Sequence, residues 1–182
     1  MGGDATTDTD RGWIKISEAA EALAKSAVEV GIFGGIHNLL GQSIADYAID
    51  NEFGAPKAHI PERSFVRATV DRNRGKYDKL VDQLIDDILE GRGTVQGGLV
   101  ILGMMVQNDI KLFITNFRSP ADAPATILKK LNRHDFKRFK KLGVLPIGAN
   151  HPLIDTGAMR NAVLFRVIDT TGGGQEPAGE GA

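Results

Sequence analysis

Two long helical patterns follow one another in the middle of the chain, and they constrain the fold more than any other feature. Between residues 64 and 90, apolar side chains recur at the spacing of an amphipathic helix. They are Tyr77, Leu80, Val81, Leu84, Ile85, Ile88 and Leu89. Gly91 and Gly93 end this pattern, and a second helix is predicted from about Val95 to Phe117, before Pro120. Its buried face is predicted to consist of Leu99, Leu102, Val106, Ile110, Phe113 and Phe117.

Shorter elements surround these two helices. The β-branched, partly alternating run from Val28 to Gly34 predicts a strand, and residues 163–167 predict another. Ser17 is placed to cap a first helix through about Ala27, and Ser43 begins a short helix that Gly54 follows as a stop. The buried stripe predicted for the first helix is Ala20, Leu23, Ala24 and Ala27. The fold class predicted is α+β, a small antiparallel or mixed sheet packed by three to four helices, two of them long.

The 182 residues are enough for one domain with a sizeable core and few for two. We expect a single α+β domain over residues 13–169. Residues 1–12 are polar and predict a flexible arm. Residues 170–182 contain five glycines and predict a flexible tail.

Composition excludes several classes of function. The formal net charge of −1 argues against a molecule that binds nucleic acid over its whole surface. The absence of cysteine excludes disulfides and thiolate metal sites. The first residues lack the basic and apolar regions of a signal peptide, and the apolar run from Leu99 to Val106 is interrupted by Gly103 and too short to span a bilayer. We therefore expect no membrane association.

No catalytic or metal-binding constellation emerges from the sequence. His37, His59, His134 and His151 are scattered without metal-ligand spacing. The glycines from Gly31 to Gly35 follow a strand, but they lack the pattern of a phosphate loop and predict a turn. Neither Asp86 nor Asp87 is placed to act as an acid–base pair, because adjacent residues on a helix point in different directions. The sequence predicts no enzyme, no cofactor and no metal.

A basic segment between residues 129 and 141 is the strongest local charge feature, with seven Lys or Arg in 13 residues. These residues are Lys129, Lys130, Arg133, Lys137, Arg138, Lys140 and Lys141. Phe136 and Phe139 are interleaved with them. Three interpretations stay open: a solvated helix face, a dock for an acidic protein, or a contact to nucleic acid phosphates.

The connection from Ile44 to Asp71 has the character of a docking element. Pro61 fixes its own backbone and favours an extended conformation before it, so the loop loses less entropy on binding. Three arginines, Arg63, Arg67 and Arg160, can bind carboxylates of a partner through two hydrogen bonds. The alternative is pairing within the chain, with Glu52, Glu62, Asp71 or Asp155 as acceptors.

Three motifs, in a fixed order, carry a resemblance. The first is Ala48 with Glu52, Phe53 and Gly54, after a strand that ends in glycine. The second is Ile60, Pro61, Arg63, Phe65 and Arg67. The third is Pro152, Leu153, Asp155, Thr156, Gly157, Met159, Arg160 and Asn161. From Val28 to Val167 the chain resembles the tail-completion and neck proteins of tailed bacteriophages, also called minor tail or virion morphogenesis proteins.

The resemblance implies a structural virion protein without catalytic activity, assembled in the host cytoplasm. Such subunits form a ring, of six or twelve copies, at the head–tail junction, between portal or connector and tail tube or tail terminator proteins. DNA passes through the lumen without sequence recognition. The subunit and partner interface would comprise Glu52, Phe53, Ile60, Pro61, Arg63, Phe65, Arg67, Asp155 and Arg160. The seven basic residues would face DNA or an acidic partner. The alternative function is a nucleic-acid-binding protein that uses residues 129–141.

The chain departs from the family in two places. The basic segment before Pro152 is longer than in the family, and the glycine-rich tail is unusual. These departures leave the ring size and the neighbouring proteins open.

Overall fold

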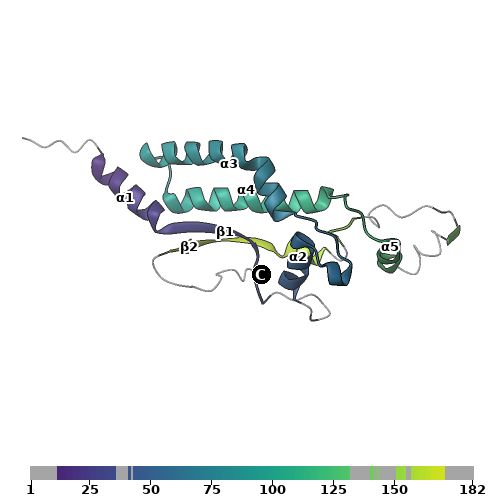
Figure 1. Ribbon diagram of the computed structural model, residues 1–182. Helices are drawn as coiled ribbons and strands as arrows, with labels where there is room; N and C mark the ends of the chain where they lie inside the picture. Colours follow the sequence, from purple (N-terminus) through teal and green to yellow (C-terminus); the bar gives the residue numbers. More distant parts are fainter. Residues whose placement is uncertain are drawn as a thin grey trace, which may run out of the picture. The chain divides into compact units, whose positions relative to one another are not determined.

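The computed structural model describes residues 12–35, 41, 43–131, 140–141, 143, 151–154 and 157–170. Within these residues the chain has six α-helices, one 3-10 helix and a two-stranded antiparallel sheet (Figure 1). The elements in chain order are α1 (Trp13–Ala24), β1 (Ser26–Ile32), α2 (Ile44–Phe53), η1 (Pro56–Ala58), α3 (Val66–Leu89), α4 (Val95–Asn116), α5 (Pro124–Lys130), α7 (Ala158–Asn161) and β2 (Val163–Asp169). The α+β class with a small sheet is confirmed.

The described chain separates into two compact units. Unit 1 comprises Met1–Glu29, Gly75–Gly103 and Arg166–Ala182, and unit 2 comprises Val30–Arg74 and Met104–Phe165. Both units are built from segments that are separated in the sequence, because β1, α3, α4 and β2 each contribute residues to both. The division therefore gives no boundary along the chain.

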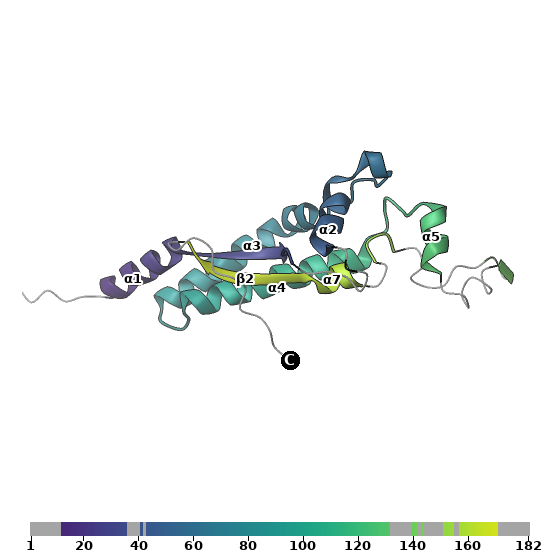
Figure 2. The ribbon, with the colours of Figure 1, turned by 90° about the horizontal axis from the view of Figure 1, so that it is seen from below.

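Unit 2 contains the hydrophobic core. Phe65, Ile110, Ile114, Leu153 and Val163 are each at most 2% exposed. They come from the residue just before α3, from α4, from the segment before α7 and from β2, and the buried residues of α2 and α7 join them. Figure 2 shows how α7 leads into β2, which places Met159 and Val163 in the same core. This core fixes the start of α3 relative to α2.

Unit 1 buries much less. Among its described residues, Tyr77 is the one large apolar side chain that is buried. Gly98 of α4 lies beside Leu84 and Ile88 of α3, so the two helices pack closely there. Ile85 and Leu89, predicted on the buried stripe, are 37% and 47% exposed. The other members of the predicted stripe after Tyr77, which are Leu80, Val81, Leu84 and Ile88, are half-buried.

Helix α1 differs from the prediction in both start and burial. It begins after Gly12, whose positive φ of 93° forms the N-terminal cap, so Ser17 lies inside the helix and caps nothing. It ends at Ala24, because β1 begins at Ser26. None of its residues is buried, so the predicted stripe of Ala20, Leu23 and Ala24 packs against no core, and Ala27 belongs to β1.

The two long helices and their stops lie close to the predicted positions. The first was predicted from Ser64 to Glu90 and spans Val66–Leu89, and the second ends at Asn116. By length and composition alone, α4 could also cross a membrane. It is the one helix within the described residues that passes this test, which core helices of soluble proteins pass as well.

Candidate functional site

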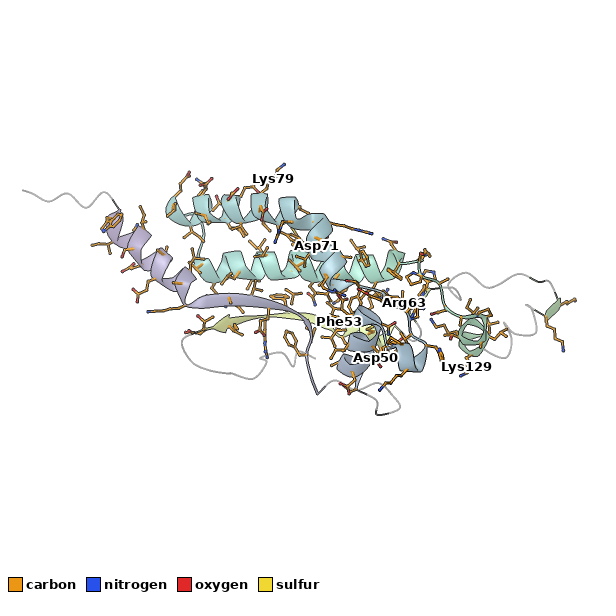
Figure 3. The ribbon with its side chains drawn as sticks, viewed as in Figure 1. Asp50, Phe53, Arg63, Asp71, Lys79 and Lys129 are labelled. Atoms are coloured by element: carbon orange, nitrogen blue, oxygen red, sulfur yellow. The ribbon has the colours of Figure 1, made fainter. Side chains whose placement is uncertain are left out.

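The candidate site is the connection between α2 and α3 in unit 2. The Ser43 side chain accepts a hydrogen bond from the Asp46 backbone N–H at 3.2 Å and caps α2, as its sequence predicts. Ile44 and Ala48 face the core, whereas Ile49 and Phe53 are 56% and 61% exposed. Phe53 and Asp50 lie on α2, and Arg63 lies in the connection (Figure 3). The helix therefore presents an apolar outer edge.

Gly54 ends α2 and begins a closed loop. Its φ of 76° is a conformation that other residues rarely adopt, and an added Cβ would lie 2.9 Å from the backbone nitrogen of Glu62. Ala55 and Ile60 then exchange two backbone hydrogen bonds, of 2.9 and 3.1 Å, which close the loop around η1. His59 completes the turn with a positive φ of 55°. The loop is thus held by its own backbone, with Pro56, Lys57, Ala58 and His59 exposed.

Glu52 caps the N-terminus of α3 from the neighbouring helix. Its carboxylate accepts hydrogen bonds from the backbone N–H groups of Phe65, Val66 and Arg67, at 2.7 to 3.1 Å. The Ser64 hydroxyl donates to the same carboxylate at 2.9 Å, and the Arg67 guanidinium donates at 3.0 Å. These donors satisfy the orphan N–H groups of the first turn and place a negative charge at the positive end of the helix dipole.

The environment of Glu52 lowers its pKa. Burial favours the neutral acid and raises the pKa, but the hydrogen bonds from Val66, Arg67 and Ser64 favour the carboxylate and outweigh burial. The pKa of Glu52 therefore lies below its ordinary value, and the group is ionised at neutral pH. A carboxylate with all its acceptor positions in use is a structural group.

A second buried cluster is centred on Asp122. One of its oxygens accepts a hydrogen bond from Arg63 at 2.9 Å and the other accepts from Lys130 at 2.7 Å. The three side chains are 4% to 10% exposed. Arg63 also donates to the Asn51 side chain and to the carbonyls of Pro120 and Ala121, each at 3.2 Å. Lys130 donates to the carbonyls of His151 and Ile154, each at 2.9 Å.

This cluster joins four separate segments of unit 2. Two cations share one carboxylate, and the polar oxygens around them satisfy their remaining donors. It lies beside an open hollow of about 890 Å³ between the 55–60 loop and residues 121–126. The donors of Arg63 and Lys130 are engaged inside the chain, so among the described residues these two buried cations are not available to an anion in the hollow.

The structure corrects the interface role expected of three motif residues. Glu52 and Arg63 are 6% exposed and Phe65 is 1% exposed, so their side chains form internal contacts and cannot supply the surface of an interface. For Arg67 the alternative of internal pairing is what the structure shows, with Glu52 and Glu62 as acceptors. Arg63 pairs with Asp122, which was not among the expected acceptors.

Other predicted interface residues stay at the surface. Phe53 and Pro61 are exposed and Ile60 is half-buried. The Arg67 guanidinium lies 4.7 Å from the centre of the Phe53 ring and holds the ring on the outside of α2. Arg160 is half-buried and donates to the Asn161 side chain at 3.4 Å. Asp155 lies outside the described residues.

The basic residues of segment 129–141 also differ in whether they are engaged inside the chain or exposed. Lys130 was expected to contact DNA or an acidic partner, and this is corrected because its ammonium group is engaged inside unit 2. Lys129, Lys140 and Lys141 are exposed. Arg133, Lys137 and Arg138 lie outside the described residues.

Sequence reasoning missed Asn51 and Asp122 as parts of the site. Neither carries a local signal: Asn51 is an interior helix position, and Asp122 follows Arg63 by 59 residues. In the parts of the chain that the structure describes, no group of three or more His, Asp or Glu side chains is placed to hold a metal ion.

The geometry therefore describes a rigid internal framework that holds an apolar edge, formed by Ile49, Phe53 and the 55–60 loop, at the surface of unit 2. Comparisons with protein-family models, with curated proteins and with solved structures found no match for this chain.

Proposed function

We propose that this chain is a structural virion protein of a tailed phage. It forms a ring at the head–tail junction or at the head-proximal end of the tail, joins the connector to the tail, and leaves a lumen for DNA. It acts by assembly and carries no active site.

The observation that carries this proposal is the convergence of the three motifs in unit 2. Glu52 of the first motif accepts hydrogen bonds from the backbone N–H groups of Phe65 and Arg67 of the second motif, at the N-terminus of α3. Lys130 binds the carbonyl of Ile154, inside the third motif. Leu153 and Met159 of the third motif share a core with Phe65. Residues that match a family pattern at three distant places thus belong to one structural unit, which supports a resemblance of whole architecture over chance similarity.

Two further features fit an assembly protein. The 55–60 loop is closed by its own backbone, so it can dock with little loss of conformational entropy. Large apolar side chains remain exposed on α1, α2 and α4, among them Trp13, Phe53 and Met104. Exposed apolar surface of this kind marks interaction sites in soluble proteins.

The test is to purify the chain and measure its mass distribution by mass photometry and its shape by negative-stain microscopy. The measurement is made on the chain alone and on the chain mixed with candidate connector and tail tube proteins. We expect a closed ring of six or twelve copies, either alone or on its partner. A chain that stays monomeric with every neck and tail component present contradicts the proposal.

The structure gives less support to the alternative of nucleic-acid binding, since Lys130 is not available to phosphates. A steep loss of DNA binding with added salt, abolished by charge reversal at Lys137 and Arg138, would favour that alternative.

A further inference from the structure

Two separate contacts hold β1 and β2 in one antiparallel register (Figure 1). The Thr170 backbone N–H donates to the Lys25 carbonyl at 2.6 Å, just beyond the ends of both strands. The Arg166 guanidinium donates to the Glu29 carboxylate at 2.8 Å across the strands. Glu29 follows Lys25 by four residues and Arg166 precedes Thr170 by four, so both contacts give the same register. In this register Glu29 lies opposite Arg166.

The register shows which backbone groups face away from the partner strand. Along an antiparallel pair, residues that exchange hydrogen bonds alternate with residues whose N–H and C=O groups point outward. The Thr170 bond to Lys25 therefore assigns the outward groups of β1 to Ser26, Val28, Val30 and Ile32. Those of β2 include Val163, Phe165 and Val167. The Gln107 side chain donates to the Val163 carbonyl at 2.7 Å, which agrees with an outward direction and caps that end of β2.

The outer edge of β1, its side away from β2, has no neighbouring strand within the described residues, since the sheet there has two strands. Soluble proteins usually protect such an edge from pairing with lysine, proline, a bulge or a short strand. β1 is seven residues long, and its sequence SAVEVGI contains no lysine, arginine or proline. These features are those of a strand that accepts a further strand, with backbone hydrogen bonds as the main source of affinity.

The charges favour β2 of a second copy as that further strand. Glu29 is the one charged residue of β1, and β2 carries Arg166 opposite it and Asp169 at its end. The Glu29 and Arg166 side chains are 43% and 33% exposed. Two nitrogens of Arg166 lie 2.7 and 2.8 Å from one carboxylate oxygen, Oε2. Within the described part of the chain, Oε1 of Glu29 therefore remains available to a second guanidinium.

Other pairings of the same two edges lack this complementarity. A second β1 would bring no positive charge within its strand, and a β2 laid against β2 would bring Arg166 toward another Arg166. β2 of a second copy would bring its Arg166 opposite Glu29 or one diagonal step away, which is within reach of a long side chain. Opposite charges at such positions stabilise a pair of strands, and like charges destabilise it.

We propose that the outer edge of β1 pairs with the outer edge of β2 of the next copy. Val28 and Val30 exchange backbone hydrogen bonds with β2 of that copy, and each Glu29 lies between two Arg166 guanidiniums. The two edges differ, so the contact is head-to-tail, and repetition of a head-to-tail contact closes a ring when the rotation permits. This inference rests on the proposed ring-forming function and names the contact that builds the ring.

An exchange of charges tests the pairing between copies. Glu29→Arg alone places like charges at every contact and should weaken association about tenfold. Glu29→Arg combined with Arg166→Glu restores opposite charges within each chain and between identical chains, so rings should form again. In a mixture assembled from dilute monomers, the wild type and this double variant should sort into separate rings, because every mixed contact opposes like charges. Native mass spectrometry with ¹⁵N-labelled wild type counts the two chains in each ring.

The matched control exchanges an ion pair outside the sheet. Asp87 and Arg92 form a pair whose side chains are 45% and 56% exposed. Asp87→Arg combined with Arg92→Asp should enter rings with the wild type at random. Circular dichroism checks that all variants fold.

A second pair of variants tests the backbone edge itself. Val28→Pro removes one outward N–H of β1 and leaves the hydrogen bonds between β1 and β2 in place, since edge strands tolerate proline there. Val28→Thr keeps the N–H group and the β-branched shape. Val28→Pro should associate about tenfold more weakly than the wild type, whereas Val28→Thr should associate normally. Mass photometry over a concentration series measures both.

Each contrary result has a distinct meaning. Rings in which the wild type and the charge-exchanged variant mix at random leave the ring-forming function standing and overturn this contact. A preference for mixed assemblies would show that two β1 edges meet. Normal association of Val28→Pro would show that the edge is unused, and loss of binding to a connector protein alone would assign the edge to a strand of that partner. A wild type that never assembles, even with candidate neck and tail proteins, contradicts the proposed function itself.

Discussion

The two units of this chain bury their apolar side chains to different extents. In unit 2, the core side chains Phe65, Ile110, Ile114, Leu153 and Val163 are at most 2% exposed, and two charged networks connect the surrounding segments. Among the described residues of unit 1, Tyr77 is the one large apolar side chain that is buried, and α1 buries nothing. Both units expose large apolar side chains, but the described residues of unit 2 surround a buried core, whereas those of unit 1 bury little.

Burial also changes the roles expected of the motif residues. The motif residues of unit 2 that look most like binding groups in the sequence, Arg63 and Glu52, maintain the fold. The groups available for binding are the apolar ones beside them and those on α1. The contrast predicts that substitutions at charged residues of unit 2 lower stability, and that substitutions on α1 change stability little.

The largest loss of stability is expected for Asp122→Asn. This change removes the one carboxylate shared by Arg63 and Lys130 and leaves two buried cations. Breaking a buried ion pair by removal of one partner costs about 3–5 kcal/mol of unfolding free energy. Urea denaturation followed by circular dichroism measures it. The matched control is Asp87→Asn in unit 1, whose exposed pair with Arg92 contributes about 0–1 kcal/mol. Equal losses for the two variants would contradict the contrast between the units.

Glu52→Gln is expected to cost about 1.5–3 kcal/mol, the strength of hydrogen bonds to a charged group. Because the pKa of Glu52 is lowered in the folded chain, its stabilising contribution is fully present above the pKa of an unfolded glutamate, about 4.3. It is lost as pH falls through the lowered folded value. The stability difference between wild type and Glu52→Gln should thus be constant at neutral pH and shrink in acid. Glu62→Gln, which removes an exposed partner of Arg67, should show neither effect. A pH-independent difference would mean that Glu52 acts through packing alone.

Patterns among neighbouring residues predicted most helices and strands, but they did not predict contacts between residues far apart in the sequence. Ser43 caps α2 and Gly54 stops it as predicted, because both act on neighbouring backbone. The start of α1 was missed because the cap is a left-handed Gly12 and not the side chain of Ser17. The pairing of Arg63 with Asp122 spans 59 residues, and nothing in the sequence distinguishes it from a pairing with Glu62 or Asp71. The sequence therefore does not tell which of the motif residues face outward, because that depends on burial in the folded chain.

Replacement of either of two glycines by alanine is expected to change stability by an intermediate amount, with opposite signs at the two positions. Gly54→Ala in unit 2 forces a side chain into a positive φ and against the backbone of Glu62, which should cost about 1–3 kcal/mol. Gly75→Ala in unit 1 adds a methyl group within α3 that meets nothing within 4 Å besides its chain neighbours and the backbone of its own helix. It should raise stability by about 0.5–1 kcal/mol. Thermal unfolding of both variants measures the difference. A gain for Gly54→Ala would show that the 55–60 loop relaxes, and that it is less rigid than its hydrogen bonds imply.

The smallest effect on stability is expected for Trp13→Ala. Because Trp13 is 72% exposed and α1 buries nothing, its removal should change the unfolding free energy of the monomer by no more than about 0.5 kcal/mol. Denaturation at a concentration below association measures this change. Phe65→Ala in the core of unit 2 is the aromatic counterpart and should cost about 3–5 kcal/mol. A large loss of unfolding free energy in the monomer would show that Trp13 packs against its own chain. The apolar side chains of α1 would then not need a second copy to cover them.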